Sequence, residues 1–302
     1  MRIVVTGATG FIGRQLVQLL QSRGDDLILL TRKAPSLSPA SLKLRYVVWN
    51  PEDERSLIRE VDGVDAVVNV AGEPIVGKRW SESQKAKILK SRVNAAQIIA
   101  RSVKEASSKP KVLINASAIG FYGSRESEIL TEDSRAGSDY LAEVCKAWEA
   151  HAVRVEDFDV RVVRLRIGIV LAKHGGALRM MLPPFRIGIG GWLGSGNQWM
   201  SWIHIKDIVR LILFCLDHES AKGAINAVSP QSVTNKAFSL VLAQVLKRPC
   251  LLPVPEFALK LLLGEAAALL LASQRVMPKK AEELGFSFQF PDLRRALEEI
   301  VK

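Results

Sequence analysis

The sequence predicts an α/β protein built on a doubly wound parallel sheet. Short apolar runs alternate with helical patterns through the first two thirds of the chain, and the first run leads into a turn with three glycines. Hydrophobic residues make up 48% of the 302 residues, which is enough for the core of one large domain or of one domain and a half. Near-continuous apolar strands are typical of parallel sheets that helices cover on both faces.

Seven apolar runs predict the strands, and the segments between them predict the covering helices. The strands are expected at residues 3–5, 27–31, 46–49, 66–70, 111–116, 160–166 and 225–228. The helices are expected at 11–23, 54–61, 81–106, 140–156 and 205–216. Ser81 and Gln84 have the spacing of a capping box, in which each side chain bonds a free backbone N–H at the start of a helix.

The segment 171–200 interrupts this alternation. It holds seven glycines and is predicted to be a loop rather than a sheet element. Helical patterns return after Ser229, at 235–246, 257–272, 279–284 and 291–302, and no partner strands are expected among them. We therefore expect a nucleotide-binding domain at 1–170, to which 201–229 return, and a small, mostly helical substrate-side domain formed by 171–200 and 230–302.

Composition argues against several classes of protein. No apolar run reaches the roughly 18 residues that span a bilayer, so no membrane partner is expected. The net charge is +11, but the basic residues form no block interleaved with aromatic residues, so no nucleic-acid partner is expected either. The same charge suits a phosphorylated cofactor or an anionic substrate. The four histidines show no metal-ligand spacing, so no metal is expected.

The cysteines and the start of the chain bear on its compartment. Cys145, Cys215 and Cys250 lie far apart, which predicts a reducing compartment and no disulfide framework. The chain begins directly on a strand, so no signal peptide is expected and the cytoplasm is the expected location. An organelle stays open as the alternative, if a targeting segment has been removed.

The turn after the first strand has the pattern Gly7-x-x-Gly10-x-x-Gly13. Between a strand and a helix this pattern is typical of dinucleotide-binding sites, because the unpaired N–H groups at a helix N-terminus attract a pyrophosphate. Gly7 is expected to make the tight turn, Gly10 to let the backbone approach the phosphates, and Gly13 to pack the helix against the strand. The alternative is a bare turn without a ligand.

The end of the second strand predicts which dinucleotide binds. In NAD-specific sites an acidic residue about 20 positions past the glycines holds the ribose 2′-OH. Here the strand ends in Thr31, Arg32 and Lys33. A guanidinium can pair with a 2′-phosphate through two parallel hydrogen bonds, and Thr31 can add a hydroxyl. NADP(H) is therefore the expected cofactor, and the alternative is a solvated Arg-Lys pair.

Four segments resemble the extended short-chain dehydrogenase/reductase superfamily: TGATGFIG, NVAGEPI, NASAIGFYG and SWIHIKDI. More narrowly, RWSESQKAKILKSR, YLAEVCKAWE, GGALRMMLPPF and the tail ending ELGFSFQFPDLRRAL are similar to the YfcH-like epimerase family. This atypical branch has a small C-terminal domain of unknown function. The resemblance runs nearly end to end and implies a Rossmann domain of the extended type, a small substrate domain and NADP(H) binding, without an established substrate.

The resemblance also implies a set of cofactor contacts. They lie in the glycine turn, at the ends of strands, and on the long helix that follows the fourth strand. The residues are Gly7, Thr9, Gly10, Phe11, Ile12, Gly13, Thr31, Arg32, Asn69, Val70, Ala71, Gly72, Arg92, Ser117, Ile169 and Val170. For Arg92 the alternative is a salt bridge at the surface.

Reductases and epimerases of this superfamily use a Tyr with a Lys four residues later. Residues four apart share one helix face, and the lysine charge lowers the pKa of the phenol, which can then exchange a proton while hydride moves. This chain departs from the pattern, because Val144 follows Tyr140 at that spacing. Ala142 precedes Lys146 by four, and Ala118 occupies the usual hydroxyl position.

Three side chains remain candidates for the acid or base. Tyr122 follows the fifth strand near the expected nicotinamide, Tyr140 begins a helix, and His204 lies where the chain re-enters the sheet. The alternatives are structural: Tyr140 packs at the start of its helix, and His204 is a hydrogen-bonded histidine of the core.

Two functions stay open. The first is an NADP(H)-dependent oxidoreductase or epimerase acting on a small polar or nucleotide-linked substrate, with the glycine-rich segment as a lid. The second is a non-catalytic NADP(H)-binding regulatory or interaction protein, for instance in division, which the missing Tyr-Lys pair favours. A homodimer is one candidate assembly.

Overall fold

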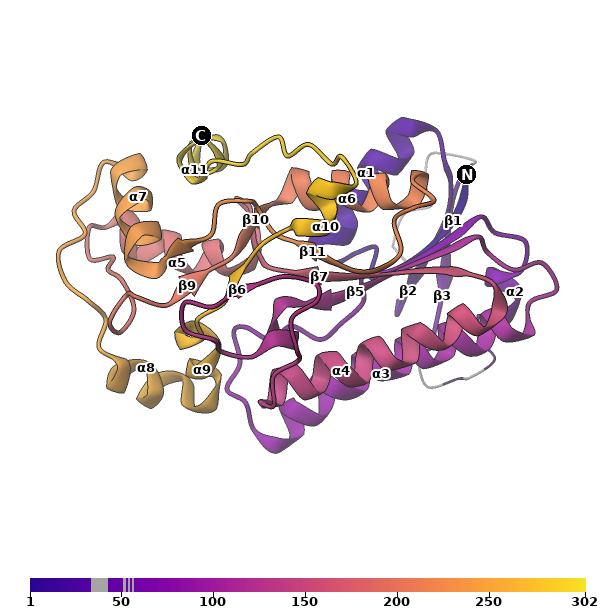
Figure 1. Ribbon diagram of the computed structural model, residues 1–302, viewed down its shortest axis with the longest axis horizontal. Helices are drawn as coiled ribbons and strands as arrows, with labels where there is room; N and C mark the ends of the chain where they lie inside the picture. Colours follow the sequence, from indigo (N-terminus) through magenta and orange to yellow (C-terminus); the bar gives the residue numbers. More distant parts are fainter. Residues whose placement is uncertain (34–42, 51–52, 54, 56) are drawn as a thin grey trace.

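The computed structural model describes residues 1–33, 43–50, 53, 55 and 57–302. Its centre is a parallel sheet of seven strands in the spatial order β11-β7-β5-β4-β1-β2-β3 (Figure 1). The strands are β1 Arg2–Thr6, β2 Asp26–Thr31, β3 Leu44–Val48, β4 Ala66–Asn69, β5 Val112–Ala118, β7 Arg161–Ile167 and β11 Gly223–Ala227. All seven predicted strands are present in this sheet, which confirms the doubly wound α/β fold.

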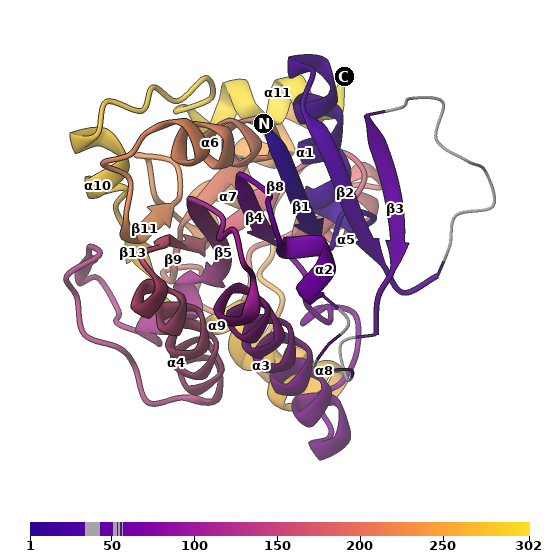
Figure 2. The same ribbon diagram turned by 90° about the vertical axis from the view of Figure 1, so that its right-hand side faces the viewer.

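Helices cover both faces of the sheet because successive strand residues point to opposite sides. In β1, Ile3 and Val5 enter one hydrophobic core and Val4 enters another. Figure 2 shows α1 and α6 on one side of the strands, with α3 and α4 on the other. The covering helices are α1 Phe11–Arg23, α2 Ile58–Val61, α3 Glu82–Glu105, α4 Tyr140–Val153 and α6 Ile205–Asp217.

The helix starts agree largely with the sequence signals. Ser81 is the N-cap of α3, and its Oγ accepts a hydrogen bond from the backbone N–H of Gln84 at 3.2 Å. The side chain of Gln84 donates to Glu73 instead of returning to Ser81, so half of the predicted capping box is present. The predicted helix 54–61 is observed from Ile58 onward, and residues 54 and 56 lie outside the described part of the chain.

The order of the strands reverses beside β1. From β1 the chain proceeds to β2 and β3 on one side and then crosses to β4 on the other. Connections that diverge in this way leave a crevice at the carboxyl ends of the two strands, and open α/β sheets bind ligands there. Thr6 at the end of β1 pairs in register with Asn69 at the end of β4. The glycine turn and residues 70–72 therefore meet at this crevice.

The expectation that 171–200 is a loop is wrong for part of this segment. Gly176–Arg186 forms helix α5, in which Leu178, Leu182 and Phe185 are buried along one face. Their spacing of four and three residues gives the apolar stripe of a surface helix, and this stripe outweighs the glycines nearby. Most of those glycines lie outside the helix. Pro183 and Pro184 stand in its last turns, where the helix soon ends.

The expectation that the tail lacks partner strands is also wrong. Strand β12 (Val233–Thr234) pairs with β9 (Trp199–Met200), and β13 (Arg275–Val276) pairs with β6 (Ile129–Leu130). These two-residue ladders are too short to show as apolar runs in the sequence. The tail helices are α7 Asn235–Leu246, α8 Glu256–Leu263, α9 Ala267–Leu271, α10 Lys279–Glu283 and α11 Leu293–Val301. The single helix expected at 257–272 is split at Gly264, which has a φ of 60°.

A third hydrophobic core joins α5, α7 and α11 around Trp202. Buried Asp207 of α6 fixes the approach to α11, because its two carboxylate oxygens accept the backbone N–H groups of Gln289 and Phe290, each at 2.8 Å. The tail is thereby attached to the face of the sheet that α1 and α6 cover. The domain boundaries given above remain a prediction.

The described residues contain neither a membrane-spanning helix nor a cluster of metal ligands. No helix among them combines the length and the apolar composition that crossing a bilayer requires. Within the same residues, no group of His, Cys, Asp and Glu side chains is arranged to hold a metal ion.

Candidate functional site

The glycine turn packs so closely that no side chain fits inside it. Gly7 has a φ of 69°, and a Cβ there would lie 2.7 Å from the carbonyl of Val70. A Cβ at Gly13 would lie 2.1 Å from the carbonyl oxygen of Gly7. Both separations are shorter than any real contact, so glycine is required at each position. The start of α1, the end of β1 and the end of β4 are therefore in direct backbone contact.

Helix α1 begins without a side-chain cap. Its N-cap is Gly10, and no acidic residue stands in its first turn. The backbone N–H of Gly10 is used by the turn itself, in a 2.9 Å bond to the carbonyl of Gly7. The first N–H groups of the helix are left for a ligand, and the helix dipole makes this end positive. This arrangement fits the pyrophosphate of a dinucleotide.

Phe11 connects this turn to the start of α5. A Cβ at Gly175 would lie 2.4 Å from the Phe11 ring, and one at Gly176 would lie 2.7 Å from the carbonyl oxygen of Val170. Glycine is therefore needed at both positions because the Phe11 ring and the Val170 carbonyl pack closely against them. The two glycines do not indicate a flexible loop. Ile169 and Val170 lie in the short strand β8 (Ile169–Leu171), next to this contact.

A pocket of about 440 Å³ opens beside the turn. Thr9, Gly10 and Phe11 line it from one side. Lys173 and Lys206 line it as well, from the segment after β8 and from α6. Lys206 is paired with Glu299, which lines the same pocket, so Lys173 and the positive end of α1 give this side of the site its preference for anions.

Thr31 and Arg32 stand at the end of β2, and their part in cofactor binding stays a prediction. Arg32 is exposed, and it makes no ion pair with any described residue. Its charge reaches across the crevice, since the pKa of Glu73 is lowered first by a hydrogen bond from Lys78 and further by the charge of Arg32. The hydroxyl of Thr31 donates to the carbonyl of Lys33 at 2.6 Å, which shapes the turn that presents Arg32.

Asn69 belongs to a row of polar side chains inside the sheet. Thr6 donates to its Oδ1 at 2.6 Å, and its Nδ2 donates to Oδ1 of Asn115 at 2.7 Å. All three side chains are buried and come from neighbouring strands at one level. The side chain of Asn69 is therefore occupied within the sheet, and the backbone of residues 70–72 borders the crevice instead.

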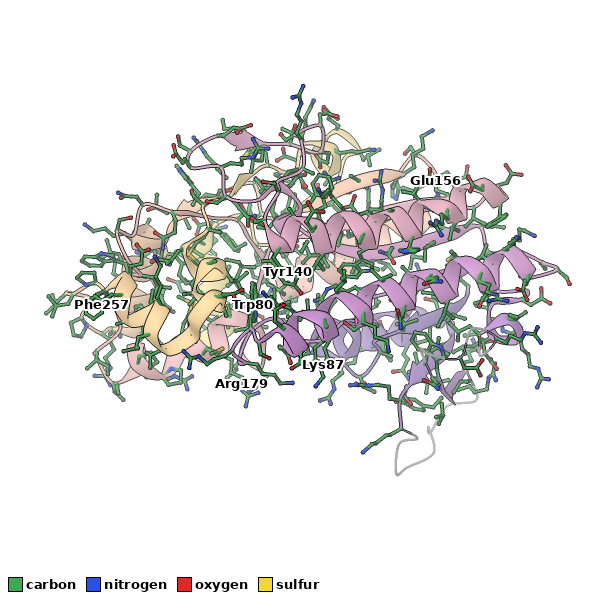
Figure 3. The ribbon with its side chains drawn as sticks, turned by 90° about the horizontal axis from the view of Figure 1, so that it is seen from below. Trp80, Lys87, Tyr140, Glu156, Arg179 and Phe257 are labelled. Carbon is green, nitrogen blue, oxygen red and sulfur yellow. The ribbon has the colours of Figure 1, made fainter. Side chains whose placement is uncertain are left out.

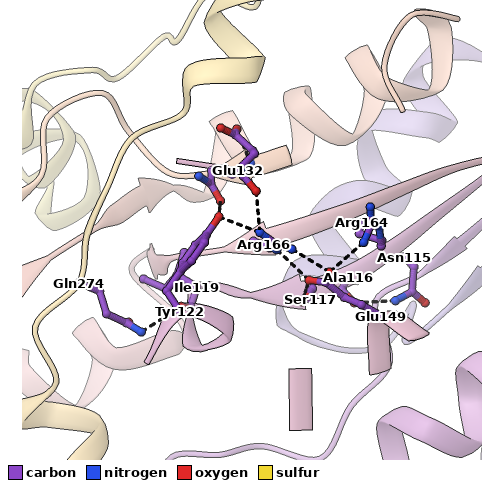
Figure 4. A network of polar contacts seen from close by, with 11 residues as sticks. Asn115, Ala116, Ser117, Ile119, Tyr122, Glu132, Glu149, Arg164, Arg166 and Gln274 are labelled. Atoms are coloured by element: carbon purple, nitrogen blue, oxygen red, sulfur yellow. Dashed lines mark hydrogen bonds and ion pairs between the residues drawn. The ribbon is translucent and has the colours of Figure 1, made fainter. Parts of the chain in front are cut away.

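A buried ionic network joins α4 to strands β5 and β7 (Figure 4). Glu149 of α4 pairs with Arg166 at 2.9 Å and with Arg164 at 3.2 Å. It also accepts a 2.7 Å hydrogen bond from the hydroxyl of Ser117. Sequence reasoning missed Glu149 and both arginines. The available signal was the pair Arg164 and Arg166 at alternate positions of a strand that is apolar apart from its arginines.

The uncharged phenol of Tyr122 extends this network beyond Arg166. Its hydroxyl donates to Asn226 at 2.6 Å and accepts from Arg166 at 3.0 Å. The side chain is fully buried, and burial raises the pKa of the phenol to about 12. This geometry favours a structural role for Tyr122 over the proton transfer predicted for it.

Tyr140 and Lys146 do not form a catalytic pair. The Tyr140 hydroxyl donates to the backbone carbonyl of Lys85 at 2.7 Å, and its ring packs edge-on against Trp80 where α3 and α4 begin (Figure 3). Burial raises the pKa of this phenol, against the charges of Arg92 and Lys85. Lys146 pairs with Glu143 on the exposed side of α4. The observed packing is the structural alternative considered for Tyr140.

His204 caps helix α6 from inside the core. Its Nδ1 accepts the backbone N–H of Lys206 at 3.2 Å, and Nε2 lies 3.0 Å from a carboxylate oxygen of Glu299. An Nδ1 that accepts carries no proton, so the proton belongs on Nε2, which donates to Glu299. Burial lowers the pKa of the imidazole, although the charge of Glu299 opposes this effect. His204 is thus placed as a neutral hydrogen-bonded residue of the core.

Two family models match the chain. Residues 3–228 match the model described as the NAD dependent epimerase/dehydratase family, and residues 254–300 match a domain of unknown function, DUF1731. The boundary between the two matches falls within the helical tail.

Relatives of known name match over nearly the whole chain. The epimerase family protein SDR39U1 homolog, chloroplastic, of Arabidopsis thaliana is 44% identical and covers 100% of this chain and 87% of its own length. The epimerase family protein YfhF of Bacillus subtilis is 37% identical, with coverage of 100% and 98%. The crystal structure of human epimerase family protein SDR39U1 with NADPH superposes with a TM-score of 0.90 at 33% identity, covering 99% of each chain.

The buried network predicts a large loss of stability on removal of its carboxylate. Glu149→Gln leaves the Arg166 guanidinium buried without a counter-charge, and we expect the free energy of unfolding to fall by about 3–5 kcal/mol. Urea denaturation measures this change. Glu143→Gln is the matched control, because it removes an exposed ion pair from the same helix and is expected to cost less than about 1 kcal/mol. Equal effects of the two substitutions would contradict the role given to Glu149.

The buried position of His204 predicts a dependence of stability on pH. Because burial lowers its pKa, the unfolded protein binds more protons at this residue than the folded protein. The contribution of neutral His204 is present above its unfolded pKa of about 6.5 and is lost as the pH falls below that value. His204→Asn keeps a capping acceptor without this titration.

Unfolding of both proteins across this pH range measures the effect. We expect wild type to lose more stability than His204→Asn on acidification. His218→Asn, at the exposed end of the same helix, should behave as wild type does. An identical pH dependence of wild type and His204→Asn would show that the imidazole keeps its ordinary pKa.

Proposed function

Because the chain belongs to the NAD dependent epimerase/dehydratase family, we propose that it is an NADP(H)-dependent oxidoreductase or epimerase with a small polar or nucleotide-linked substrate. The family membership confirms the resemblance found in the sequence. Fold and family do not by themselves establish a reaction, so the proposal is argued from the site.

The observation that carries the cofactor proposal is the uncapped start of α1 at the crevice between β1 and β4. Gly7 and Gly13 allow the backbone contacts that place this helix end there, and no side chain blocks it. When bound, the nicotinamide group would supply hydride chemistry. The chain's own contribution would be to bind the phosphates at the turn and to exclude water with α5 and Phe11.

The choice of NADP(H) over NAD(H) is supported by Arg32. It stands exposed at the end of β2, where an NAD-specific site carries an acidic residue, and its guanidinium can hold a 2′-phosphate through two hydrogen bonds. The human relative, which was solved with NADPH, supports the same choice.

A second candidate function is favoured because the hydroxyl groups near the site are all hydrogen-bonded within the protein. Ser117, Tyr122 and Tyr140 each donate to a protein acceptor, and the Tyr-x-x-x-Lys pair is absent. A site of this kind suits a protein that binds NADP(H) without turnover and acts through a partner. The homodimer named above remains a proposal with either function.

The compartment proposed from the sequence is a reducing one. All three cysteines are free, and burial raises the pKa of Cys145 to about 11 and that of Cys215 to about 12, which makes both thiols unreactive. We propose the cytoplasm. The Arabidopsis relative, which is named as chloroplastic, supports an organelle as the alternative.

Arg32 predicts the cofactor preference. We expect wild type to bind NADPH more tightly than NADH, and Arg32→Asp to weaken NADPH binding at least about tenfold, because a charge-assisted pair is replaced by repulsion. Titration calorimetry with both nucleotides measures the preference. Arg248→Asp, on the exposed turn after α7, makes the same change in net charge and should leave both affinities unaltered. An unchanged preference in Arg32→Asp would exclude Arg32 as the discriminating residue.

The enzyme proposal predicts turnover. With NADPH and a panel of carbonyl compounds and nucleotide sugars, we expect at least one substrate to oxidise the cofactor faster than it does without protein, and Arg32→Asp to slow that reaction. Absorbance of NADPH measures the rate. Binding of NADPH without turnover across the panel would favour the second candidate. No heat with either nucleotide would overturn both.

A further inference from the structure

The large apolar side chains that are most exposed among the described residues belong to one end of the molecule. Each is 68–76% exposed, and the next in exposure, Val48 of β3, is 61% exposed. Isolated apolar side chains are ordinary on a protein surface, but a contiguous group of them marks an interaction surface. This group, called the end patch below, consists of Ile187, Ile189, Leu251, Leu252, Phe257, Leu261 and Leu262.

Two neighbouring chain segments carry the first four of these side chains. The backbone N–H of Val254 donates to the carbonyl of Trp192 at 2.7 Å. Nearer to α5, a Cβ at Gly188 would lie 3.6 Å from the ring of Pro249. The segment that follows α5 thus runs parallel to the segment that precedes α8. The two isoleucines of the end patch therefore lie beside its first two leucines.

Helix α8 continues the end patch. Six of its eight residues are apolar, yet Leu259 is the one that is buried. A helix that is apolar nearly all round is normally covered on every side. Figure 1 shows α8 and the connection from α7 at the end of the molecule away from the N-terminus, and Figure 3 shows Phe257 at its edge. The apolar surface of α8 is therefore left open to an external partner.

Three cations border the end patch. Arg186 directly precedes Ile187, and Lys247 and Arg248 directly precede Pro249 in the turn after α7. All three side chains are exposed, and within the described part of the chain none of them forms an ion pair. Their charges are available to an anionic surface outside the molecule.

Acidic residues are nearly absent from the same region. The sequence has no Asp or Glu at 160–206 or at 220–255, and the acidic residue of α8 is Glu256. Lys260 pairs with this carboxylate at 2.7 Å. The surroundings of the end patch are therefore positively charged, and they are complementary to a surface that carries negative charge.

We propose that the end patch binds the protein peripherally to an anionic lipid surface. The apolar side chains enter the boundary between head groups and acyl chains, and the three cations attract acidic head groups. A peripheral contact of this kind requires no membrane-spanning helix. The expectation that no membrane partner exists was based on the length of apolar runs, which bears on spanning segments alone.

The shape and charge of the end patch favour lipid over a protein partner. Such strongly exposed side chains project from the surface instead of lining a groove, and a bilayer deforms to receive them. In a symmetric dimer the end patch would face its own copy. That arrangement would bring Arg186, Lys247 and Arg248 close to the same cations of the second chain, and like charges across an interface are unfavourable.

Co-sedimentation of the full chain with lipid vesicles tests the proposal. One set of vesicles contains phosphatidylcholine alone, and the other contains phosphatidylcholine mixed with phosphatidylglycerol. We expect wild type to bind the mixed vesicles and to bind those of phosphatidylcholine much more weakly. Added salt should weaken the binding, because it screens the attraction between the cations and the head groups.

Two double variants separate the apolar contribution from the charge contribution. Leu251→Ser with Leu252→Ser removes two apolar side chains, and Lys247→Ser with Arg248→Ser removes two cations. We expect each double variant to bind the mixed vesicles at least about tenfold more weakly than wild type.

The controls make similar changes outside the end patch. Val48→Ser removes an exposed apolar side chain from β3. Lys104→Ser with Lys111→Ser removes two exposed cations near the start of β5. These controls should bind the mixed vesicles as wild type does. Urea denaturation verifies that every variant is folded.

Three results would overturn the proposal: no binding of wild type to the mixed vesicles, equal binding to both kinds of vesicle, or unchanged binding by either double variant of the end patch. A wild-type dimer that Leu251→Ser with Leu252→Ser converts into monomers, without binding to vesicles, would also overturn it and would assign the end patch to a second copy of the chain. No nucleotide enters these measurements, so their outcome is independent of the proposed function.

Discussion

The candidate site depends on backbone segments that touch with no side chain between them. A methyl group at Gly13 would lie 2.1 Å from the carbonyl oxygen of Gly7, and one at Gly7 would overlap the end of β4. This contact holds the uncapped start of α1 directly over the switch point of the sheet. It also fixes residues 70–72, and through Gly72 it fixes the guanidinium of Arg92. The glycine turn, residues 70–72 and Arg92 are therefore joined by one chain of close contacts.

The buried network explains why this site holds few free proton donors. Glu149 accepts from Ser117 and from two arginines, and this arrangement compensates a carboxylate that would otherwise be costly to bury. Tyr122 completes the network with a phenol whose pKa is raised to about 12. In a Tyr-Lys reductase a nearby lysine has the opposite effect on the phenol. The hydroxyl groups of Ser117 and Tyr122 thus stabilise the fold at the expense of reactivity.

The sequence predicts the sheet because its signal is local. Each strand is a short apolar run, and covering both faces of the sheet requires no other pattern. The sequence predicts a loop in place of helix α5 because the many glycines of 171–200 are a stronger local signal than the apolar stripe of Leu178, Leu182 and Phe185. The two-residue strands of the tail are set by tertiary packing, which no local pattern records. Glu149 and Arg166 lie 17 residues apart on different elements, α4 and β7, so the sequence pattern of neither element shows their pairing.

The sequence locates the cofactor candidates more directly than it reveals what the catalytic candidates contact. A glycine turn and an arginine after a strand have fixed places relative to one helix and one strand. A proton donor depends on how several elements meet, and here they meet so that Tyr122, Tyr140 and His204 are all engaged in the structure. Residue type and proximity in sequence could not reveal that engagement.

The missing Tyr-Lys pair does not by itself decide between an enzyme and a binding protein. A preorganised cation stabilises negative charge as it develops on an oxygen, and it does so without transferring a proton. Arg92 is a half-buried cation at the border of the crevice, where its Nη1 donates to two backbone carbonyl groups. With such a cation in place, hydride transfer would still require a proton from water or from the substrate itself. Whether a substrate oxygen can reach Arg92 therefore matters more for the function than the lost tyrosine does.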